Sequence, residues 1–548
     1  MKREPSALIV IPARGGSKGI PRKNLRSLVG QPLIAYAIAT ARASRHRPYV
    51  VVTTDDDEIA LVAERLGAHV HRRDPRLADD AATLDPVIHD AVTNVEVRLG
   101  CRFSLVVTQQ PTSPLLRSES LDAAIARMLD DPGIDTVISA TNDTHLSWRR
   151  DGERYHPNYT ERVNRQYLPP TFRETGGFFI SRREHVTASG RFGPRVHLHE
   201  LAMPESIDID SHADWGLCTH YLRRRRVLFV VTGHRRVGLG HVYHSLLVAN
   251  DLVDHEVAFL VDRGSTLAFQ AIASRHYPVT MQHGESLVDH IADLRPHVVV
   301  NDRLDTDLAY MEALGRLGVK TINIEDLGPG AALADAVINA IYPDTDLGGD
   351  PRAFFGPAYA CLRDEFVLLT PRPASPRVER VLVTFGGTDP GGFTLTVLDA
   401  IEVWCAERGI AVDVVTGLGF DDAIDITRFQ HARFHKRVDN ISAFMRAADV
   451  AFTSAGRTLF ELASVGTPAI VMAQNERELT HTFAAERHGF VHLGLGHHVA
   501  ASSILAALSR IVADDAYRHV LRERMLAVDL RQGRSNVVRV IDEIVRHA

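Results

Sequence analysis

A loop rich in glycine and basic residues follows the first apolar run of the chain. That run, Ala7 to Ile11, predicts a buried strand leading directly into the loop. The loop reads IPARGGSKGIPRKN and holds three glycines and four cations: Gly15, Gly16, Gly19, Arg14, Lys18, Arg22 and Lys23. Backbone N–H groups and fixed cations at the end of a strand together suit a polyphosphate. The spacing of a Walker loop is absent, and a basic surface turn is the alternative interpretation.

Two aspartates that stand two positions apart, Asp208 and Asp210, are candidates for binding a divalent cation. On a strand, alternation would direct both carboxylates to one face and turn Ile209 into the core. Mg2+ needs few carboxylates, because water and phosphate oxygens supply its other ligands. The pair alone is commonplace, and a solvated strand end would have the same sequence.

Two further glycine loops stand in the second half of the chain. The strand Val227–Val231 leads to GHRRVGLGHVYHS, which contains His241, and the strand Val381–Phe385 leads to GGTDPGG, Gly386–Gly392. Histidine suits proton transfer because its ordinary pKa lies near neutrality. A single histidine after glycine is nevertheless more often structural. The backbone amides of the later loop are candidates for binding a pyrophosphate.

The elements that position these loops follow an alternating pattern. Strands alternate with amphipathic helices from Ala7 to about Leu222, which predicts a mostly parallel sheet with a site at the carboxyl ends of its strands. Arginines 223–226 indicate a solvated junction, and the strand–loop–helix pattern then restarts twice around a Pro-rich stretch at 371–376. We therefore predict an α/β protein with a Rossmann-like domain at 1–222 and two lobes at 227–370 and 378–548, with substrate in the cleft between the lobes.

Composition excludes several classes of protein. The 548 residues require two to four domains, and 45% hydrophobic with 24% charged residues is ordinary for a globular chain. The net charge of −6 argues against general nucleic-acid binding. The 4 cysteines are widely spaced and indicate free thiols in a reducing compartment. Without a membrane-spanning run or room for a signal peptide before the first strand, the sequence predicts a cytoplasmic protein.

Five further segments resemble, in the right order, the CMP-sialate synthetases, which are cytidylyltransferases that activate nonulosonic acids. Together with the glycine loop they cover roughly Ala7 to Leu222, and they are TTDDDEIA (53–60), RDPRLADD (73–80), QPTSPLLRS (110–118), RQYLPPTFRETGGFFI (165–180) and IDID (207–210). The resemblance implies a nucleotidyltransferase that converts CTP and a nonulosonic acid of the sialic, pseudaminic or legionaminic type to a CMP-nonulosonate and pyrophosphate. It also implies Mg2+ as cofactor and a homodimer.

Individual positions inherit expected roles from this resemblance. Arg14 and Lys23 would stabilise charge on the triphosphate during transfer. The residues expected to contact the nucleotide are Asn24, at the cytosine, and Arg73, Gln110 and Thr112. Arg165 and Arg173 would pair with the carboxylate of the sugar acid, although surface arginines are an equal alternative. Asp208 and Asp210 match the metal-binding aspartates, and Glu174 with Gly176 and Gly177 matches an acidic turn.

The second half resembles two-lobed enzymes of the GT-B type that act on nucleotide sugars. GLGH, Gly238–His241, resembles the motif of the UDP-sugar hydrolases of the pseudaminate pathway, of relatives in spore-coat polysaccharide synthesis, and of two-lobed glycosyltransferases. The resemblance implies that His241 activates water. TSAGRTLFELASVGTPAIVMAQN, 453–475, resembles the nucleotide-binding block of that group. The residues expected to bind a UDP-sugar are Gly387, Thr388, Ser454, Gly456, Glu461 at the ribose, and Asn475 at the sugar.

The second half also departs from the hydrolase pattern. Where the hydrolases tend to carry Asp-His-Tyr, this chain has Asn301, Asp302 and Arg303. Where they carry paired aspartates, it has Glu325 and Asp326. The arginine often found three residues after the catalytic histidine is replaced by His244. Three hypotheses therefore remain for this half: a UDP-sugar hydrolase, a glycosyltransferase, or a catalytically silent domain that binds a UDP-sugar and regulates the first half. Under all three hypotheses, the expected partners are small molecules and not nucleic acid.

Overall fold

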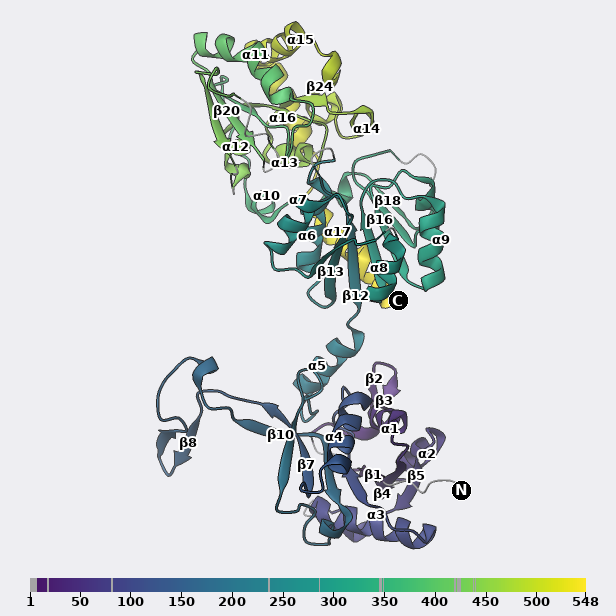
Figure 1. Cartoon of the computed structure of the whole chain (residues 1–548). Coiled ribbons are helices and arrows are strands. Elements are labelled where there is room, and N and C mark those ends of the chain that lie inside the picture. The colour runs from purple at the N-terminus through teal and green to yellow at the C-terminus, as the bar shows by residue number, and fades with distance from the viewer. Residues whose placement is uncertain are drawn as a thin grey trace. The chain divides into compact units, whose positions relative to one another are not determined.

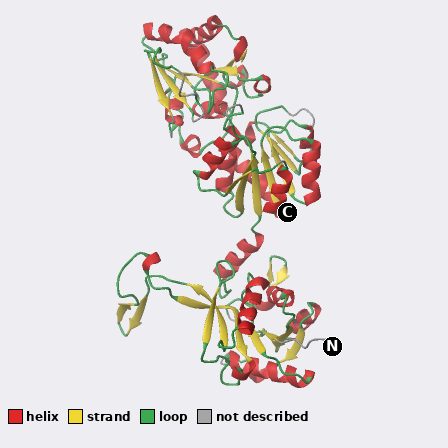
Figure 2. Cartoon of the chain, in the orientation of Figure 1, coloured by secondary structure: helices red, strands yellow, loops and turns green. Residues whose placement is uncertain are grey.

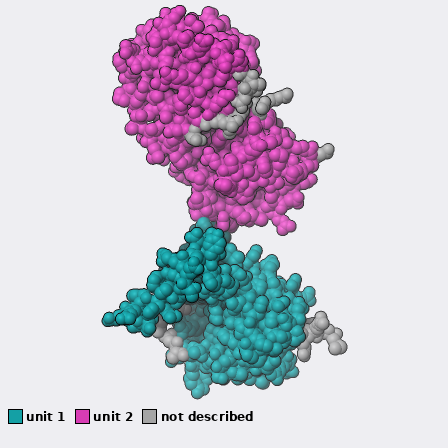
Figure 3. All heavy atoms as spheres, turned by 60° about the vertical axis from the view of Figure 1, so that its left-hand side comes forward, with its two compact units in different colours: residues 1–223 teal, residues 224–548 magenta. Residues whose placement is uncertain are grey.

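The computed structural model describes residues 7–548 apart from 17–18, 80–81, 235–236, 285, 344–346, 348, 418–419, 421–424, 437 and 439. Lys18 of the glycine loop therefore lies outside the described residues. The chain divides into two compact units, residues 1–223 and residues 224–548 (Figure 3). In the part of the chain that is described, none of the helices combines the length and the apolar character needed to cross a bilayer.

A seven-stranded sheet forms the centre of unit 1 (Figure 1). Its order is β11-β7-β10-β6-β1-β4-β5, and only β10 runs antiparallel to its neighbours. The strands are β1 (Ala7–Pro12), β4 (Tyr49–Thr54), β5 (His69–Arg72), β6 (Leu105–Thr108), β7 (Thr136–Asn142), β10 (Phe172–Arg182) and β11 (Val196–Glu200). The mostly parallel sheet that the sequence predicts is confirmed.

Helices pack on both faces of this sheet because side chains alternate along each buried strand. In β1, Ala7, Ile9 and Ile11 face one core, whereas Leu8 and Val10 face the other. The helices on the first face are α1 (Leu33–Ala43), α2 (Asp57–Arg65) and α4 (Ser118–Asp130), and α3 (Leu84–Leu99) covers the second. The remaining short elements are β2 (Ser27–Leu28), β3 (Gln31–Pro32), η1 (Lys23–Leu25), η2 (Pro75–Leu77) and η4 (Arg183–His185), and α5 (His212–Arg223) ends the unit.

An arm extends from the sheet between β7 and β10. It consists of the hairpin β8 (Trp148–Asp151) and β9 (Arg154–Pro157), followed by η3 (Arg165–Tyr167). Long loops join the hairpin to the sheet, and the hairpin stands apart from the helices that cover the core (Figure 2). Arg165 therefore lies on the arm.

The aspartate pair does not lie on a strand, so that prediction is wrong. Residues 207–210 form no ladder; instead the Ile209 N–H donates to the carbonyl of Thr112 at 2.8 Å. Ile209 is completely buried, as expected, while Asp210 is exposed. The segment stays extended because the loop after β6 accepts its backbone hydrogen bond. Successive side chains therefore still point in opposite directions without a sheet.

The first lobe of unit 2 is a seven-stranded parallel sheet of order β14-β13-β12-β15-β16-β17-β18. Its strands are β12 (Arg226–Val231), β13 (Glu256–Val261), β14 (Val279–Met281), β15 (Val298–Asp302), β16 (Lys320–Ile324), β17 (Ala336–Asn339) and β18 (Ala353–Phe355). Its helical segments are α6 (Gly240–Asp251), α7 (Thr266–Ala273), α8 (Leu287–Leu294), α9 (Leu308–Leu317), η5 (Pro329–Leu333) and η6 (Pro357–Tyr359).

The second lobe is a six-stranded parallel sheet of order β21-β20-β19-β22-β23-β24. Its strands are β19 (Arg380–Val383), β20 (Ala411–Thr416), β21 (Ala432–Lys436), β22 (Val450–Thr453), β23 (Ala469–Ala473) and β24 (Phe490–Leu495). The helical segments are α10 (Asp364–Leu368), α11 (Phe393–Glu407), α12 (Ile441–Ala447), α13 (Thr458–Val465), α14 (Glu476–Leu479), η7 (Glu486–His488), η8 (Gly496–His498), α15 (Ala501–Ala513) and α16 (Asp515–Leu526). The predicted pair of Rossmann-like lobes, the GT-B architecture, is present.

The last helix, α17 (Gly533–Arg546), returns to the first lobe. Its apolar residues Val537 and Ile541 are fully buried with Val227 and Phe229 of β12. Gly533 lies so close to Ala360 that a Cβ would come within 2.0 Å of the Ala360 carbonyl oxygen. We therefore propose that the first lobe comprises 227–370 together with α17, and that the second ends with α16.

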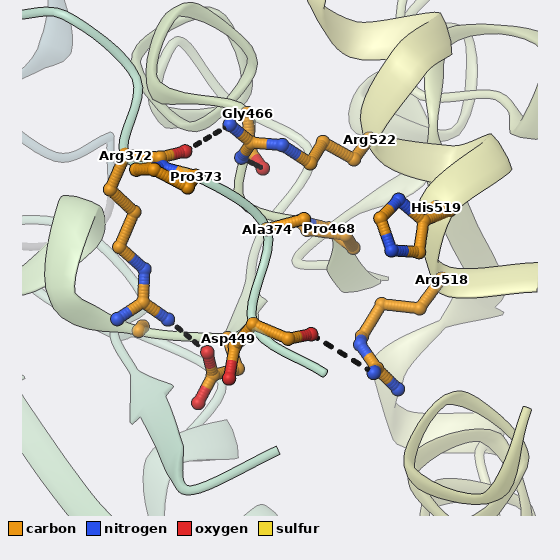
Figure 4. A pocket seen from close by; sticks show the side chains of 11 residues that line it. Arg372, Pro373, Ala374, Asp449, Gly466, Pro468, Arg518, His519 and Arg522 are labelled. Carbon is orange, nitrogen blue, oxygen red and sulfur yellow. Dashed lines mark hydrogen bonds and ion pairs between the residues drawn. The ribbon is translucent and has the colours of Figure 1, made fainter. Parts of the chain in front are cut away.

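Arginines of α16 fasten the Pro-rich linker to the second lobe (Figure 4). Arg518 donates to the carbonyls of Ser375 and Pro376 at 3.3 and 3.1 Å, and Arg522 donates to that of Arg372. Arg372 in turn pairs with the buried Asp449. Residues 372–376 are therefore bound to the second lobe.

Candidate functional site

The glycine loop is held at the carboxyl edge of the sheet in unit 1. Buried Asn24 donates from Nδ2 to the carbonyl oxygen of Arg14 at 3.0 Å, which closes the loop. The Gly15 N–H donates to Asp55 Oδ1 at 3.2 Å. A Cβ on Gly15 would lie 2.6 Å from Asp56 Oδ2, so a larger residue there would have to displace the Asp56 carboxylate. Asp55 and Asp56 follow β4, the neighbour of β1, and the sequence analysis did not identify them.

The second part of this loop lies against the aspartate pair. Lys23 donates from Nζ to the carbonyl oxygen of Ile209 at 2.6 Å, and the same nitrogen lies 3.5 Å from Asp210 Oδ1. The Lys23 side chain is 16% exposed, against 82% for that of Asp210. The fold therefore brings a half-buried cation next to the exposed carboxylate of the pair.

Asp208 has a buried carboxylate oxygen, Oδ1, without a hydrogen-bond partner. It faces Gly176, where a Cβ would come within 2.8 Å of Oδ1. Burial raises the pKa of Asp208 and nearby Asp210 raises it further, whereas Thr112 and Lys23 act in the opposite direction. A buried, unpartnered carboxylate oxygen is costly unless something binds it. The pair therefore fits a hard cation such as Mg2+.

A cation bound there would need ligands from outside the protein. Among the described residues, no group of three or more His, Cys, Asp or Glu side chains could hold a metal ion. Magnesium is commonly held by one or two carboxylates, with phosphates and water completing its octahedron. Two aspartates beside a basic glycine loop are consistent with this.

The expected nucleotide residues surround the same edge of the sheet. The Gln110 N–H donates to the carbonyl of Gly176 at 3.3 Å, and the Thr112 carbonyl accepts from Ile209. Arg73 is 7% exposed and donates from Nη2 to the carbonyl of Thr53 at 2.8 Å. Burial lowers the pKa of the Arg73 guanidinium, whereas Asp55 opposes that shift. Arg14, Lys23, Asn24, Arg73, Gln110, Thr112, Asp208 and Asp210 thus gather at one edge.

The two arginines expected to bind the sugar acid lie elsewhere in unit 1. Arg173 is exposed at the start of β10 and its Nε donates to Asp143 Oδ2 at 3.2 Å. Arg165 is exposed on the arm, in η3. Within the described residues, no contact links either arginine to the aspartate pair. Asp143 is a partner that no sequence motif indicated.

In unit 2, His241 is held by a buried aspartate. His241 lies in the first turn of α6, and its Nδ1 is 2.8 Å from Oδ1 of Asp302 at the end of β15. Because an ionised carboxylate only accepts hydrogen bonds, Nδ1 carries the proton and Nε2 is left for a substrate. Asp302 is 0% exposed. In the sequence, Asp302 stands out only as a departure from the hydrolase pattern.

Asp302 also binds two other residues of α6. His244 Nδ1 lies 2.5 Å from Oδ2, and the Ser245 hydroxyl donates to the same oxygen at 2.8 Å. Burial and the cation Arg457 act to lower the pKa of His244, but Asp302 raises it to about 9. Burial acts to raise the pKa of Asp302, but His244, His241 and Arg457 hold it well below the ordinary value. His244 therefore carries a positive charge at neutral pH, at the position where the resembled enzymes have arginine.

Two arginines of the second lobe reach the same part of the first lobe. Arg457 Nη2 lies 3.0 Å from Glu325 Oε2 and 3.6 Å from Asp302 Oδ1. Arg477 pairs with Asp305 at 2.6 Å, donates to the Glu325 carbonyl at 2.5 Å, and stacks on Tyr342. The two lobes are thus joined through charged groups beside His241.

The glycine loops of the two lobes approach each other. A Cβ on Gly387 would lie 3.7 Å from the Cβ of Leu239, and a Cβ on Gly238 would lie 3.6 Å from the hydroxyl of Thr388. Gly238 has φ +86°, a conformation that favours glycine. Residues expected at a nucleotide-sugar site therefore face one another across the lobes, and Ser454 and Gly456 come just before Arg457.

Other expected residues of the second lobe have partners within the protein. Glu461 is not an exposed helix charge; it pairs with Arg363 at 2.9 Å, and burial raises its pKa. Asn475 caps α14 by accepting from the Glu478 N–H at 3.1 Å. Glu478 accepts from the N–H groups of Ala455 and Gln474 at 3.2 and 2.8 Å, and burial raises its pKa to about 7. No motif indicated Glu478, which supports the loop before α13.

The first part of the chain matches a known protein family. Residues 8–156 match the cytidylyltransferase family. The N-acylneuraminate cytidylyltransferase of Oncorhynchus mykiss is 35% identical over 231 residues, which are 41% of this chain and 51% of that protein. The CMP-N,N'-diacetyllegionaminic acid synthase of Legionella pneumophila is 32% identical over 218 residues, 38% of this chain and 93% of that protein.

Other relatives have different lengths or more distant sequences. The post-translational flagellin modification protein B of Campylobacter coli is 26% identical over 226 residues, 40% of this chain and 96% of that protein. This chain spans about half the length of the fish relatives that it matches. For these fish proteins the similarity therefore concerns one part of each molecule.

Solved structures resemble each half at low sequence identity. A CMP:2-keto-3-deoxy-manno-octonic acid synthetase complexed with CTP covers 39% of this chain and 98% of its own, with 17% identity and a TM-score of 0.30. MurG of Acinetobacter baumannii covers 58% and 99%, with 13% identity and a TM-score of 0.41. At these TM-scores neither likeness supports a functional inference.

Proposed function

The chain belongs, through its N-terminal unit, to the CMP-sialate synthetase family of cytidylyltransferases, and from this premise we propose that unit 1 converts CTP and a nonulosonic acid to a CMP-nonulosonate. The anomeric hydroxyl oxygen of the sugar acid forms a bond to the α-phosphorus of CTP. The bond from that phosphorus to the bridging oxygen breaks, pyrophosphate leaves, and the hydroxyl proton passes to solvent. Arg14 and Lys23 stabilise the negative charge that develops on the phosphates.

One observation carries this proposal: the unpartnered Oδ1 of Asp208 beside exposed Asp210, within reach of Lys23. Asp208 and Asp210 would hold Mg2+, which when bound neutralises the triphosphate as a Lewis acid. Asn24 would bind the cytosine, while Arg73, Gln110 and Thr112 would position the rest of the nucleotide.

The test is pyrophosphate release from CTP by the full chain. Sialic, pseudaminic and legionaminic acids are offered in turn, with Mg2+ and again with a chelator in its place. We expect release with at least one acid and none with the chelator. Absence of release with every acid, or release that ignores the chelator, contradicts the proposal.

The sugar acid and the oligomer are part of the same proposal. Arg165 and Arg173 would pair with the carboxylate of the acid. The arm exposes Trp148, Tyr155 and Tyr167 at 53%, 64% and 72%. We propose that a second copy of the chain covers these rings and forms a homodimer. Light scattering of the wild type and of a triple Trp148→Ser, Tyr155→Ser, Tyr167→Ser variant tests it, because only the variant should be monomeric.

For unit 2 we propose hydrolysis of a UDP-sugar, supported by the His241–Asp302 hydrogen bond. His241 Nε2 takes a proton from water, the water oxygen forms a bond to the anomeric carbon, and the bond to the UDP oxygen breaks. UDP leaves as an anion, held by Gly387, Thr388, Ser454 and Gly456. Asp302 keeps the imidazole oriented and stabilises its protonated form.

Free UDP is the readout that separates this function from its alternatives. The full chain is incubated with UDP-sugars without any acceptor, and hydrolysis predicts UDP release that His241→Ala removes. UDP binding without release favours a glycosyltransferase. If His241→Ala changes no product rate while UDP-sugars still alter CTP turnover, unit 2 is a regulatory domain.

A further inference from the structure

Arg457 extends from the second lobe into the histidine cluster of the first. It follows Gly456 and immediately precedes α13, and its ion pair with Glu325 connects it to the first lobe. Its side chain is 23% exposed, and it approaches Asp302 and Glu325. The arginine therefore connects a candidate phosphate-binding segment to the aspartate that holds His241.

The two oxygens of Asp302 have different partners. Oδ1 lies 2.8 Å from His241 Nδ1 and 3.6 Å from Arg457, whereas Oδ2 binds His244 and Ser245. Arg457 thus shares the oxygen that His241 uses. A cation at that oxygen reduces the carboxylate's ability to stabilise a protonated imidazole.

Glu325 has an unusual backbone conformation at the point where the second lobe contacts the first. It follows β16 with φ +54°, a left-handed conformation that non-glycine residues adopt only when their surroundings hold them. It is 4% exposed; its carboxylate pairs with Arg457 and its carbonyl accepts from Arg477. Its N–H also donates to the carbonyl of Ile338 at 2.9 Å within the first lobe, so contacts in this lobe and with both arginines of the second lobe hold the residue.

We propose that Arg457 is a positioning residue that couples nucleotide binding on the second lobe to the protonation of His241. This inference rests on the proposed UDP-sugar activity of unit 2. A diphosphate at Ser454–Gly456 fixes the backbone from which Arg457 extends. The guanidinium then weakens the stabilisation that the negative charge of Asp302 gives to protonated His241. His241 Nε2 can then accept a proton from water when the lobes are joined around a nucleotide.

His244 shows what a buried carboxylate does to a neighbouring imidazole. Even with the opposing effects of burial and Arg457, Asp302 raises the pKa of His244 to about 9. The other titratable groups facing the cluster are Glu325 after β16, Tyr342 after β17, Cys361 after η6 and His481 after α14. His244 is the cation at Oδ2, and Arg457 is the cation beside Oδ1, the oxygen that His241 uses.

The test measures the protonation of His241 directly in the full chain. Diethyl pyrocarbonate modifies neutral imidazole, and peptide mass spectrometry follows its reaction at His241 across the neutral range of pH. Arg457→Gln should raise the midpoint of this titration by about 1 pH unit, since it removes a cation a few ångströms away. Arg457→Lys keeps the charge and should retain the wild-type midpoint.

Arg477→Gln is the matched control. Arg477 also joins the lobes, through Asp305, Glu325 and Tyr342, but no contact with Asp302 is found among the described residues. If Arg457 merely tethers the lobes, both glutamine variants shift the midpoint equally, and the inference is overturned. An unchanged midpoint in Arg457→Gln also overturns it. Arg457→Met, similar in volume, replaces the glutamine variant if circular dichroism shows that it does not fold.

UDP release adds a readout that separates the two proposals. Where the wild type releases UDP, the acid limb of its pH–rate profile should move to higher pH in Arg457→Gln and remain in place in Arg477→Gln. If the midpoint shifts but the wild type releases no UDP from any UDP-sugar, the hydrolase proposal fails while the effect of Arg457 on His241 stands.

Discussion

Asp208 in unit 1 is partly buried and Asp302 in unit 2 is completely buried, and the two aspartates have opposite surroundings. Asp208 Oδ1 has no hydrogen-bond partner, and burial raises the pKa of its carboxyl group. Both oxygens of Asp302 are bound, by His241, His244 and Ser245, with Arg457 close by, and the pKa of this carboxyl group lies well below its usual range. The Asp208 carboxylate therefore needs a cation from outside the chain. The Asp302 carboxylate already has cationic partners in His244 and Arg457.

This difference separates two ways of building a site. A site with an unpartnered oxygen gains its missing interactions from the ligand, so its activity should depend steeply on metal concentration and pH. A site completed by its own ion pairs is preorganised, and its activity should depend on geometry within the protein.

The largest effect is expected from removing the unpartnered carboxylate. Asp208→Asn should lower pyrophosphate release from CTP by about 10⁴-fold, because metal-ion stabilisation of transferring phosphates is worth several kcal/mol. Release of UDP by unit 2 should be unchanged. Steady-state assays of both products in one preparation measure this, and a variant that retains most of its CTP turnover would show that Asp208 is not a metal ligand.

The corresponding change in unit 2 removes the base. His241→Ala should lower UDP release by about 10³-fold, the usual contribution of a general base, with CTP turnover unchanged. Asp302→Asn should lower it as well and also destabilise the protein by about 3 kcal/mol, since it leaves a charged His244 buried without its carboxylate. Equilibrium denaturation distinguishes this variant from His241→Ala, which should unfold at nearly the wild-type denaturant concentration.

The pKa shift of Asp208 predicts how protons compete with Mg2+. A raised pKa means that the carboxyl group takes up its proton at higher pH than an ordinary aspartate, and only the ionised form binds metal. Below that pKa the Mg2+ concentration for half-maximal pyrophosphate release should rise about tenfold per pH unit. Asp208 adds most to folding stability below its unfolded pKa, and this contribution is lost as pH rises through the folded pKa. A half-maximal Mg2+ concentration independent of pH would argue against binding at Asp208.

The smallest effect should come from the glycine that faces Asp208. Gly176→Ala places a Cβ 2.8 Å from Asp208 Oδ1 and should displace the carboxylate, lowering CTP turnover by roughly tenfold. Gly216→Ala, on α5 with nothing within 4 Å of its Cβ, is the matched control and should leave turnover unchanged. Equal turnover in both variants would mean that the position of Asp208 is not critical.

Local features of the sequence predicted much of the fold. The apolar run before Gly15 and the alternation of strands and helices indicated parallel sheets, because strand and helix periodicities depend on neighbouring residues. The restart after Arg226 indicated the two lobes in the same way. The sequence analysis placed the last helix within 378–548, and we propose the first lobe for it because Val537 and Ile541 pack with Val227 and Phe229.

What the sequence alone determined is therefore local: the strands, the glycine loops at their ends, and the residue types able to bind a triphosphate or transfer a proton. Tertiary structure decided which of them meet. Asp302 lies 61 positions from His241, Gly176 faces Asp208 only because β10 passes beside residues 207–210, and Arg457 arrives from another lobe. Periodicity and motif spacing contain no information about such pairs, because the contact depends on how sheets and lobes pack and not on neighbours along the chain.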